Sequence, residues 1–270
     1  MLRLHLRRAS ARLLGLLLVA SQFAAAEPLR PEVAIIIDDL GNRRADGERA
    51  LALPGPLNFG ILPHTPYAKR LAAIAVRRDH EVIIHMPMQP LGASNPGPGA
   101  LAIHMSRLDV ENALARALSA VPQAQGLNNH MGSLATANEA LMRTVMQTLS
   151  RLAPAKFFYL DSRTAATSVS ERLAHAHQVP HLSRDVFLDN VREASAIRTQ
   201  LELLVAKAHR TGHAIGIGHP YAETLEVLEA EVPRLVAAKV RLVKLSRLAH
   251  RLGHQPQLAR QNSLIPSTNE

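Results

Sequence analysis

Short apolar runs alternate with amphipathic stretches along most of this chain of 270 residues, and the alternation limits the folds that it can adopt. The apolar runs cover 33–37, 57–62, 81–85, 126–130, 156–160, 179–183, 214–218 and 240–245. Helical patterns separate most of them, at 43–53, 66–78, 109–120, 137–152, 168–178, 193–211 and 221–238. This alternation predicts an α/β protein with a parallel sheet and helical crossovers. The number of units favours a closed or nearly closed barrel, and an open doubly wound sheet is the alternative.

The two ends of the chain depart from this pattern. Residues 1–26 contain four arginines, then the short apolar run 13–20, and end in three alanines. This order is typical of a secretory signal peptide, because the apolar run is too short to span a bilayer. An uncleaved N-terminal anchor is the alternative. We expect a single barrel domain over 27–254, a polar flexible tail over 255–270, and a periplasmic or secreted protein without a stable membrane span after cleavage.

The composition excludes several classes of protein. The formal net charge is +9, but four of these positive charges lie in residues 1–26, and the others are scattered along the sequence. Only 3% of the residues are aromatic and none is Trp, so the stacking surfaces that bind single-stranded nucleic acid are missing. The chain has no Cys, which excludes disulfides, thiolate nucleophiles and cysteine-bound metals. Nucleic acid is therefore not an expected partner.

Ionisable residues follow six of the apolar runs, at the point where each run ends. They are Asp38 and Asp39, His85, His130, Asp161 with Arg163, Arg184 with Asp185, and His219. The carboxyl ends of parallel strands meet at one edge of a sheet or barrel, and ligands bind there. A single residue of this kind is commonly a loop or helix cap. Six runs that end in this way predict an active site at that edge.

Two histidines and a carboxylate at one edge predict a divalent metal site. Zinc is the first choice, because it accepts imidazole nitrogen and carboxylate oxygen, and a zinc-bound water has a pKa of about 7. Of the adjacent Asp38 and Asp39, one carboxylate would bind the metal and the other would take a proton from the attacking water. His219 would protonate the leaving group. A solvated turn before Gly41 is the alternative interpretation of the Asp pair.

Six segments, taken in order, resemble the divergent polysaccharide deacetylases, which are exported bacterial proteins related to the NodB-like carbohydrate esterases. The segments are IIIDDLG (35–41), EVIIHMPMQP (81–90), GLNNHMGS (126–133), FFYLDSRT (157–164), RDVFLDN (184–190) and AIGIGHP (214–220). The resemblance extends from about residue 32 to about residue 248. It implies a distorted (β/α)7 barrel and the metal-dependent removal of an acetyl group from an N-acetylated sugar.

The resemblance also implies roles for individual residues. Asp38 stands where the related enzymes keep the catalytic base, and Asp39 where they keep a metal-binding aspartate. His85 matches the first of two metal histidines spaced four apart, but the second position holds Gln89. Because Gln is a poor zinc ligand compared with imidazole, we expect His130 to supply the missing nitrogen from the next strand.

The leading hypothesis is a metal-dependent hydrolase that acts on an acetylated polysaccharide or glycan. In it a metal ion, most simply zinc, is held by Asp39, His85 and His130. Asp38 is the base, and His219, which matches the acid histidine of the related enzymes, is the acid. Other residues would hold substrate or orient these groups, namely Gln89, Asn128, Asn129, Asp161, Arg163, Arg184 and Asp185.

The second hypothesis is a non-catalytic periplasmic protein that binds glycan or acts as a scaffold while it retains the barrel. Two features of the sequence favour it: the substituted second histidine and the absence of Trp. The latter matters because sugar rings commonly stack on large aromatic side chains. Replacing Asp38 by Asn distinguishes the two hypotheses, because an enzyme would lose its function and a binding protein would keep it.

Overall fold

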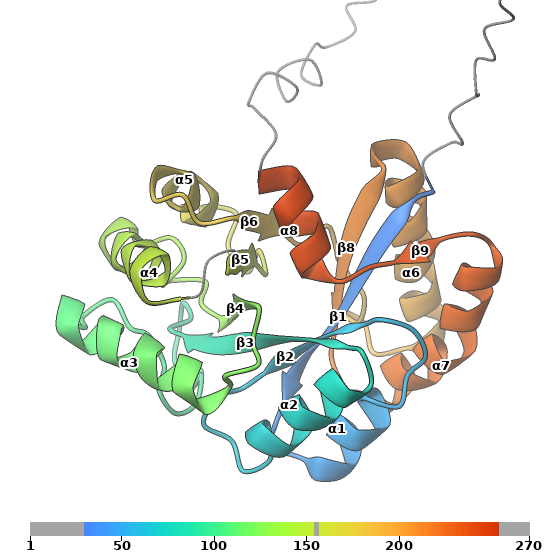
Figure 1. The fold of residues 1–270 in the computed structure, drawn as a ribbon, viewed down its shortest axis with the longest axis horizontal. Coiled ribbons are helices and arrows are strands. Elements are labelled where there is room, and N and C mark those ends of the chain that lie inside the picture. Colours follow the sequence, from blue (N-terminus) through green and yellow to red (C-terminus); the bar gives the residue numbers. More distant parts are fainter. Residues whose placement is uncertain (1–29, 154–156, 254–270) are drawn as a thin grey trace, which may run out of the picture.

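A computed structural model describes residues 30–153 and 157–253, and its centre is a parallel sheet (Figure 1). The strands lie in the order β6-β5-β4-β3-β2-β1-β8-β7, with β9 beside β1. They are β1 (Glu32–Leu40), β2 (Asn58–Ile61), β3 (Glu81–Met88), β4 (Gly126–Met131), β5 (Phe158–Asp161), β6 (His181–Ser183), β7 (Val186–Phe187), β8 (His213–Gly218) and β9 (Arg241–Leu242). All the pairings between these strands are parallel, as the sequence predicts.

The sheet curls into an incomplete barrel. Strands β6 and β7 follow one another along the chain, but no pairing joins them, so the barrel is open at this point. Strand β1 is the centre of the sheet, because it pairs with β8, with β2 and, at its start, with β9. The expected α/β barrel of a distorted type is confirmed. The two-residue strand β7 was not predicted, since so short a run has no pattern of its own.

Helices cover the outer face of the sheet (Figure 1). They are α1 (Arg44–Ala50), α2 (Ala68–Arg77), α3 (Arg107–Ala120), α4 (Glu139–Leu152), α5 (Ser170–Ala176), α6 (Ala194–Thr211), α7 (Ala222–Ala237) and α8 (Leu245–Gly253). The first seven correspond to the seven helical patterns of the sequence. Side-chain caps fix where two of them begin: Ser106 accepts from the N–H of Asp109 before α3, and Asn138 accepts from that of Leu141 before α4.

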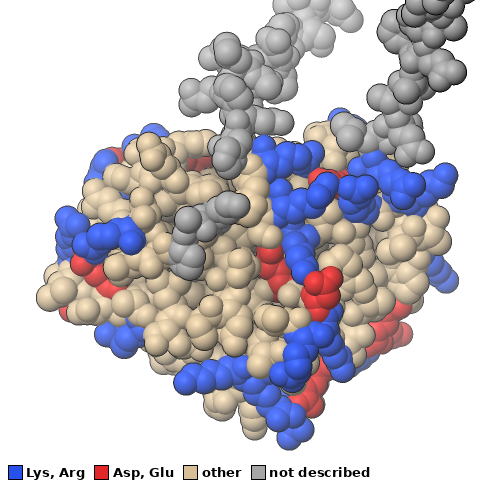
Figure 2. Space-filling model, in the orientation of Figure 1, with Lys and Arg blue, Asp and Glu red and all other residues tan. Residues whose placement is uncertain are grey.

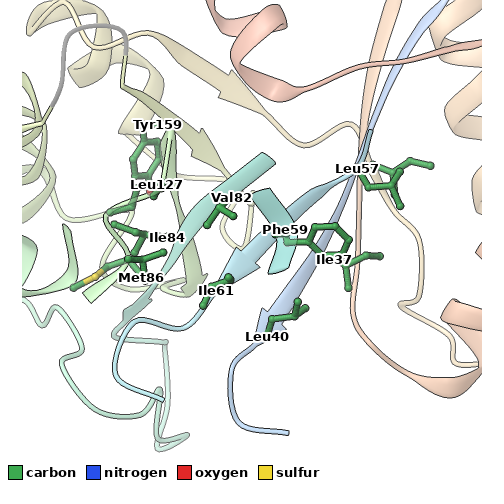
Figure 3. Packing of buried hydrophobic residues seen from close by; sticks show 14 of the residues in the cluster. Ile37, Leu40, Leu57, Phe59, Ile61, Val82, Ile84, Met86, Leu127 and Tyr159 are labelled. Carbon is green, nitrogen blue, oxygen red and sulfur yellow. The ribbon is translucent and has the colours of Figure 1, made fainter. Parts of the chain in front are cut away.

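Two apolar clusters hold these layers together. The larger lies between the sheet and the surrounding helices, and Figure 3 shows part of it, including Ile37 and Phe59. The smaller lies on the other face of the strands, inside the barrel, and includes Ala34, Ile36 and Ile217. The two clusters take alternate residues of β1, because successive side chains of a strand point to opposite faces. The same alternation decides which side chains at the strand ends reach the interior.

Helix α8 closes the end of the barrel where the strands begin. Leu245 and Leu248 are fully buried in the interior cluster. The side chain of Asn58 accepts from the N–H of Leu245 (2.9 Å), and Glu81 accepts from the N–H (2.8 Å) and the hydroxyl of Ser246. The sequence predicted an extended run over 240–245 and no helix after it, which is wrong beyond β9. The local pattern also indicates this helix, because the apolar residues Leu245, Leu248, Ala249 and Leu252 recur at helical spacing.

Three arginines gather around one buried carboxylate at the same end. Glu32 lies 2.9 Å from Arg247 and from Arg251, and 3.6 Å from Arg241. Lys and Arg side chains form a band over the part of the surface where β1 begins and α8 lies (Figures 1 and 2). The sequence suggested scattered charges, but the fold collects these three. They attach α8 and β9 to the start of β1.

Some of the sequence predictions concern residues outside the described ranges. The predicted signal peptide (1–26) and the predicted tail (255–270) both lie there, as do the two expected limits of the barrel domain, 27 and 254. Between 30 and 253, apart from the gap at 154–156, the structure contains no helix that is both long and apolar enough to cross a bilayer.

Candidate metal centre and active site

The inward face of β1 ends in Asp38. Ala34 and Ile36 point into the barrel, and Asp38, two residues further, follows them and is almost fully buried. Gly60 on the neighbouring strand β2 makes room for its carboxylate, because a Cβ at this position would lie 1.9 Å from Asp38 Oδ1. A glycine is therefore needed beside this aspartate.

The surroundings of Asp38 suit a general base. Its Oδ2 accepts from Asn128 Nδ2 (2.8 Å), whereas its buried Oδ1 has no hydrogen-bond partner among the described residues. Burial raises the pKa of Asp38, although the nearby His85 and His219 act in the opposite direction. A carboxylate with one oxygen held, the other free and a raised pKa is suited to accept a proton near neutral pH.

Asp39 would face the surrounding helices if β1 stayed regular. Its φ is +60°, in the left-handed region that residues other than glycine rarely adopt, and the register of β1 with β2 shifts between Ile37 and Leu40. This irregularity brings the Asp39 carboxylate to His85 and His130 on the inner side. Two successive carboxylates thus reach one site, at a local cost in backbone strain that is common at functional sites.

Strands β3 and β4 bring two histidines to Asp39. His85 Nε2 lies 3.1 Å from Asp39 Oδ1, and His130 Nδ1 lies 2.8 Å from the same oxygen. The two ring nitrogens are 3.1 Å apart. The three atoms therefore form a triangle with sides of 2.8 to 3.1 Å. The parallel register of β3 and β4 sets this geometry, since it pairs His85 with Asn128 and leaves His130 one step nearer the strand end on the same face.

Asn128 fixes the orientation of His85. The Asp38 carboxylate only accepts hydrogen bonds when ionised, so the amide nitrogen of Asn128 faces it and the amide oxygen faces His85. That oxygen lies 2.7 Å from His85 Nδ1 and requires this nitrogen to carry a proton. In the neutral ring the lone pair is then on Nε2, which is the nitrogen that points to Asp39 and His130.

The donor set fits a divalent metal ion. Ligand atoms that each lie about 2.0 to 2.2 Å from one tetrahedral zinc ion are about 3.3 to 3.6 Å apart, a few tenths of an ångström more than the sides of the triangle, so small side-chain shifts would admit the ion. Asp39 Oδ1 is buried and makes no hydrogen bond of good geometry with the described residues, so it is available as a ligand. Asp39, His85 and His130 thus form a group that could hold a metal ion.

Two carboxylates at the metal group, Asp38 and Asp39, stabilise a positive charge beside them. Burial lowers the pKa of His85, but Asp38 and Asp39 outweigh this effect and raise it to about 9. Burial alone would raise the pKa of Asp39, yet the contacts with His130 and His85 hold it well below its ordinary value. The two carboxylates therefore attract either a proton on His85 or a metal ion in its place.

His219 follows the inward residues of β8, and Asp189 holds it. Its Nδ1 lies 2.9 Å from Asp189 Oδ1, and its backbone N–H donates to Asp189 Oδ2 (2.6 Å), which also accepts from Thr224 Oγ1 (2.8 Å). Its Nε2 lies 4.0 Å from Asp39 Oδ2. Burial lowers the pKa of His219, but Asp189 outweighs this and raises it above the ordinary value. The imidazolium form is thus favoured, as an acid requires.

A cavity of about 460 Å³ brings these groups together. Asp38, His85, His130 and His219 line it, as do Asn129, Arg163 and Arg184. Its volume is within the range of about 300 to 1,000 Å³ that is usual for small-molecule sites. A larger hollow, about 600 Å³, lies between α6 and α7 and contains none of the strand-end residues. The smaller cavity is therefore the candidate active site, because the ionisable strand-end residues line it.

Four of the predicted supporting residues do not line the cavity, namely Asp161, Asp185, Gln89 and Asn128. Asp161 faces the helices, because Phe158 and Leu160 take the inward positions of β5, and it accepts from Ser170 Oγ (2.6 Å) and from the N–H of Arg163 (2.7 Å). Asp185 accepts from the N–H of Ile215 (2.8 Å) and pairs with Lys207 (2.6 Å). Both have partners within the fold, and neither lines the cavity.

Gln89 also lies away from the metal group. Its Oε1 accepts from the N–H of Ile103 (3.0 Å), so it fixes the long loop after β3. Asn129 lines the cavity, but its side chain mainly joins two strand ends: Oδ1 accepts from the N–H of Ser162 (3.0 Å) and from the hydroxyl of Tyr159 (3.3 Å). His130, and not Gln89, places a ring nitrogen beside Asp39 and His85.

Two residues of this site were not predicted from the sequence. Asp189 follows a run of only three apolar residues, 186–188, which is too short to be recognised as a strand end. Gly60 interrupts the apolar run 57–62, and an isolated glycine in a strand indicates a close approach of another group. The second signal was present in the sequence.

Comparison with known families agrees with the fold and the motifs. Residues 35–249 match the sequence profile of the divergent polysaccharide deacetylase family. This match covers most of the described residues and includes every strand end named above. The chain belongs to the divergent polysaccharide deacetylase family.

Particular relatives extend this result. The uncharacterized protein YibQ of Escherichia coli (strain K12) is 37% identical over 235 residues, which are 87% of this chain and 72% of the relative. The crystal structure of the uncharacterized protein ATU2773 from Agrobacterium tumefaciens C58 has a TM-score of 0.78 and 24% identity, covering 83% of this chain and 91% of that one. The peptidoglycan deacetylase PdaC of Bacillus subtilis has a TM-score of 0.51 and 11% identity over 86% and 97% of the two chains. The two structures show the likeness in fold.

Proposed function

We propose that this protein is a metal-dependent hydrolase that removes acetyl groups from a polysaccharide or glycan. The observation that carries the proposal is the convergence of five side chains at one edge of the sheet, where four of them line a single cavity and Asp39 contacts His85 and His130. Asp39, His85 and His130 present three ligand atoms to one point, and Asp38 and His219 lie beside them with the properties of a base and an acid. Membership of the family supplies the substrate class.

The first step requires activated water and a base. A divalent ion held by Asp39, His85 and His130 would polarise the acetyl carbonyl and lower the pKa of a nearby water. Asp38 would accept the proton of that water through Oδ1, which is free of other partners in the described part of the chain. Asn128 keeps the other carboxylate oxygen in place and so aims Oδ1.

The second step requires a proton for the departing amine. His219 would donate it from Nε2, because Nδ1 is engaged by Asp189. The same contact raises the pKa of His219 and keeps the ring protonated before the bond breaks. The base and the acid thus come from β1 and β8, two neighbouring strands, on either edge of the same cavity.

We also propose that the protein is exported. This proposal depends on residues 1–26, whose basic start, short apolar run and alanines are typical of a signal peptide. Fractionation of cells that express the full chain tests it. Recovery of a shortened chain outside the cytoplasm is the expected result, and a full-length chain in the cytoplasm would contradict export.

Acetate release is the direct test of the enzymatic proposal. Residues 27–270 loaded with zinc are incubated with acetylated chitooligosaccharides and with peptidoglycan fragments, and acetate is measured. The wild type should release acetate, and Asp38→Asn should not. Asp79→Asn is the matched control, because Asp79 is an exposed carboxylate paired with Lys244 outside the cavity. If metal-loaded wild type releases no acetate but binds the glycans, it is a binding protein and the enzymatic proposal fails.

A further inference from the structure

Arginines without acidic partners surround the cavity. Most arginines of the described chain lie within 4 Å of an Asp or Glu, for example Arg49 with Glu229 (2.9 Å). Arg163 and Arg184 line the cavity and have no such carboxylate among the described residues. Arg192 lies nearby, stacked over the Tyr221 ring at 3.6 Å. Unpaired guanidinium groups in a cavity are typical of sites that bind anions.

Arg184 is held firmly and still has donors to offer. Its Nε donates to the carbonyl of Ser162 (2.7 Å), and Nη2 donates to that of Arg163 (3.1 Å). The guanidinium also lies 5.0 Å from the centre of the Phe187 ring. A guanidinium has five N–H donors, so three are left without a partner in the described part of the chain. The fold therefore fixes Arg184 in position through carbonyl groups, and Asp161, Asp38 and Asp185 act on its charge only from beyond ion-pair distance.

Arg163 is placed beside Arg184 by an unusual backbone. Its φ is +52°, and Asp161 Oδ1 holds its N–H (2.7 Å). The side chain is exposed and makes no contact with an acidic residue of the described chain. The hydrogen bond from Arg184 Nη2 to the Arg163 carbonyl keeps the two residues side by side. Burial and the charge of Arg163 lower the pKa of Arg184, and Asp161, Asp38 and Asp185 act in the opposite direction without outweighing them. Two like charges kept together at a local cost in strain indicate a negative ligand between or above them.

An aromatic ring completes this side of the cavity. Phe187 lines it, is 37% exposed, and has its ring centre 5.5 Å from that of His219. The Tyr221 ring centre also lies 5.5 Å from that of His219, but Tyr221 does not line the cavity and Arg192 lies over its ring. Phe187 therefore offers an apolar face to a sugar in a chain that has no Trp. A sugar near His219 would thus be within reach of Arg184, which lies beside the same ring.

We propose that the cavity selects a glycan that carries a negative group, a carboxylate or a phosphate, on or next to the acetylated sugar, and that Arg163 and Arg184 bind this group. The inference deepens the proposed function, on which its reference to an acetylated sugar depends. Arg163 and Arg184 are then specificity-determining residues, and neutral acetylated glycans of the same length bind less well.

Binding measured apart from turnover tests this inference. Zinc-loaded residues 27–270 are titrated with three probes of equal length: neutral N-acetylglucosamine oligosaccharides, oligosaccharides in which alternate sugars carry a carboxylate, and oligosaccharides that carry a phosphate. One or both acidic probes should bind at least about tenfold more tightly than the neutral probe, and added salt should reduce the difference. The two acidic probes show which anion is preferred.

Variants assign the preference to the arginines. Arg163→Gln should remove most of it, and it should not disturb folding because the side chain has no partner in the described chain. Arg184→Gln is the second variant. Arg116→Gln is the matched control, an exposed arginine on α3 far from the cavity lining, and should keep the preference. Equal binding of neutral and acidic probes, or an unchanged preference in Arg163→Gln, would overturn the inference.

Acetate release from the same probes separates the two proposals. Equal release from neutral and acidic probes supports the proposed function and overturns the inference about charge. Selective binding of acidic probes without acetate from any of them supports the inference about charge and overturns the enzymatic proposal.

Discussion

Replacing Asn128 by Ala should weaken metal binding, although Asn128 is not itself a ligand. Its amide joins the base to the metal group, with Oδ1 2.7 Å from His85 Nδ1 and Nδ2 2.8 Å from Asp38 Oδ2. Without it, His85 loses the contact that fixes its proton on Nδ1 and its lone pair on Nε2. Loss of such a partner behind a metal-binding histidine typically reduces metal affinity by about 10- to 100-fold.

The same substitution should reduce stability. Asn128 is fully buried and makes a third contact, with Ser162 Oγ at 3.2 Å. Two of its three partners are ionisable, and leaving each of them buried without a partner costs about 1 to 3 kcal/mol. The free energy of unfolding should therefore fall by about 2 to 6 kcal/mol. For a domain of this size each kcal/mol lowers Tm by about 2 to 4 °C, so Tm should fall by about 4 to 24 °C.

Asn58→Ala is the matched control for both measurements. Asn58 is also fully buried and makes three hydrogen bonds, to the carbonyls of Ile35 and Val243 and to the N–H of Leu245, but at the opposite end of the barrel. It should lower Tm without changing the affinity for zinc, measured by competition with a coloured chelator. Wild-type zinc affinity in Asn128→Ala, with Tm lowered as in Asn58→Ala, would refute the role assigned to Asn128.

Three further substitutions test the catalytic groups. Asp38→Asn should lower kcat for acetate release by about 10²- to 10⁴-fold with unchanged zinc content, and loss of the zinc would show that Asp38 is a ligand instead. Asp189→Asn removes the charge that raises the pKa of His219. Activity falls at high pH where His219 loses its proton, so this fall should move to lower pH in the variant. A fall at the wild-type pH would exclude His219 as the acid. Gly60→Ala places a Cβ 1.9 Å from Asp38 Oδ1 and should displace the base, so that kcat falls while zinc stays bound; wild-type kcat would contradict the assigned position of the base.

The fold was largely predictable because its signals are local. Each apolar run and each helical pattern lies within one element, and the order of elements determines a parallel curled sheet. Strand β7 was not predicted, because a run of two residues has no period of its own. Helix α8 was missed although Leu245, Leu248, Ala249 and Leu252 recur at helical spacing, because the run before it was assigned as extended up to residue 245.

The site was predictable only in part. Asp38, His85 and His219 could be predicted from their positions at strand ends. Side chains alternate along a strand, so a residue that continues the inward-facing series lies at the edge of the barrel interior. The same rule shows why Asp161, one residue after the inward Leu160, faces the helices and lies outside the cavity. Asp185 lies between β6 and β7, so the rule does not apply to it, and its contacts with Ile215 and Lys207 determine its position. Inward and outward positions cannot be distinguished for runs of two to four residues without knowing which neighbours they face.

The central claim is that Asp39, His85 and His130 together hold a metal ion, with His130 in place of the ligand that Gln89 does not provide. Calorimetric titration of metal-free protein with zinc tests it most directly in the wild type, His130→Ala and Gln89→Ala. The account predicts about one ion per chain in the wild type, more than about 100-fold weaker binding in His130→Ala, and wild-type binding in Gln89→Ala. Wild-type zinc affinity in His130→Ala, or loss of binding in Gln89→Ala, would contradict it.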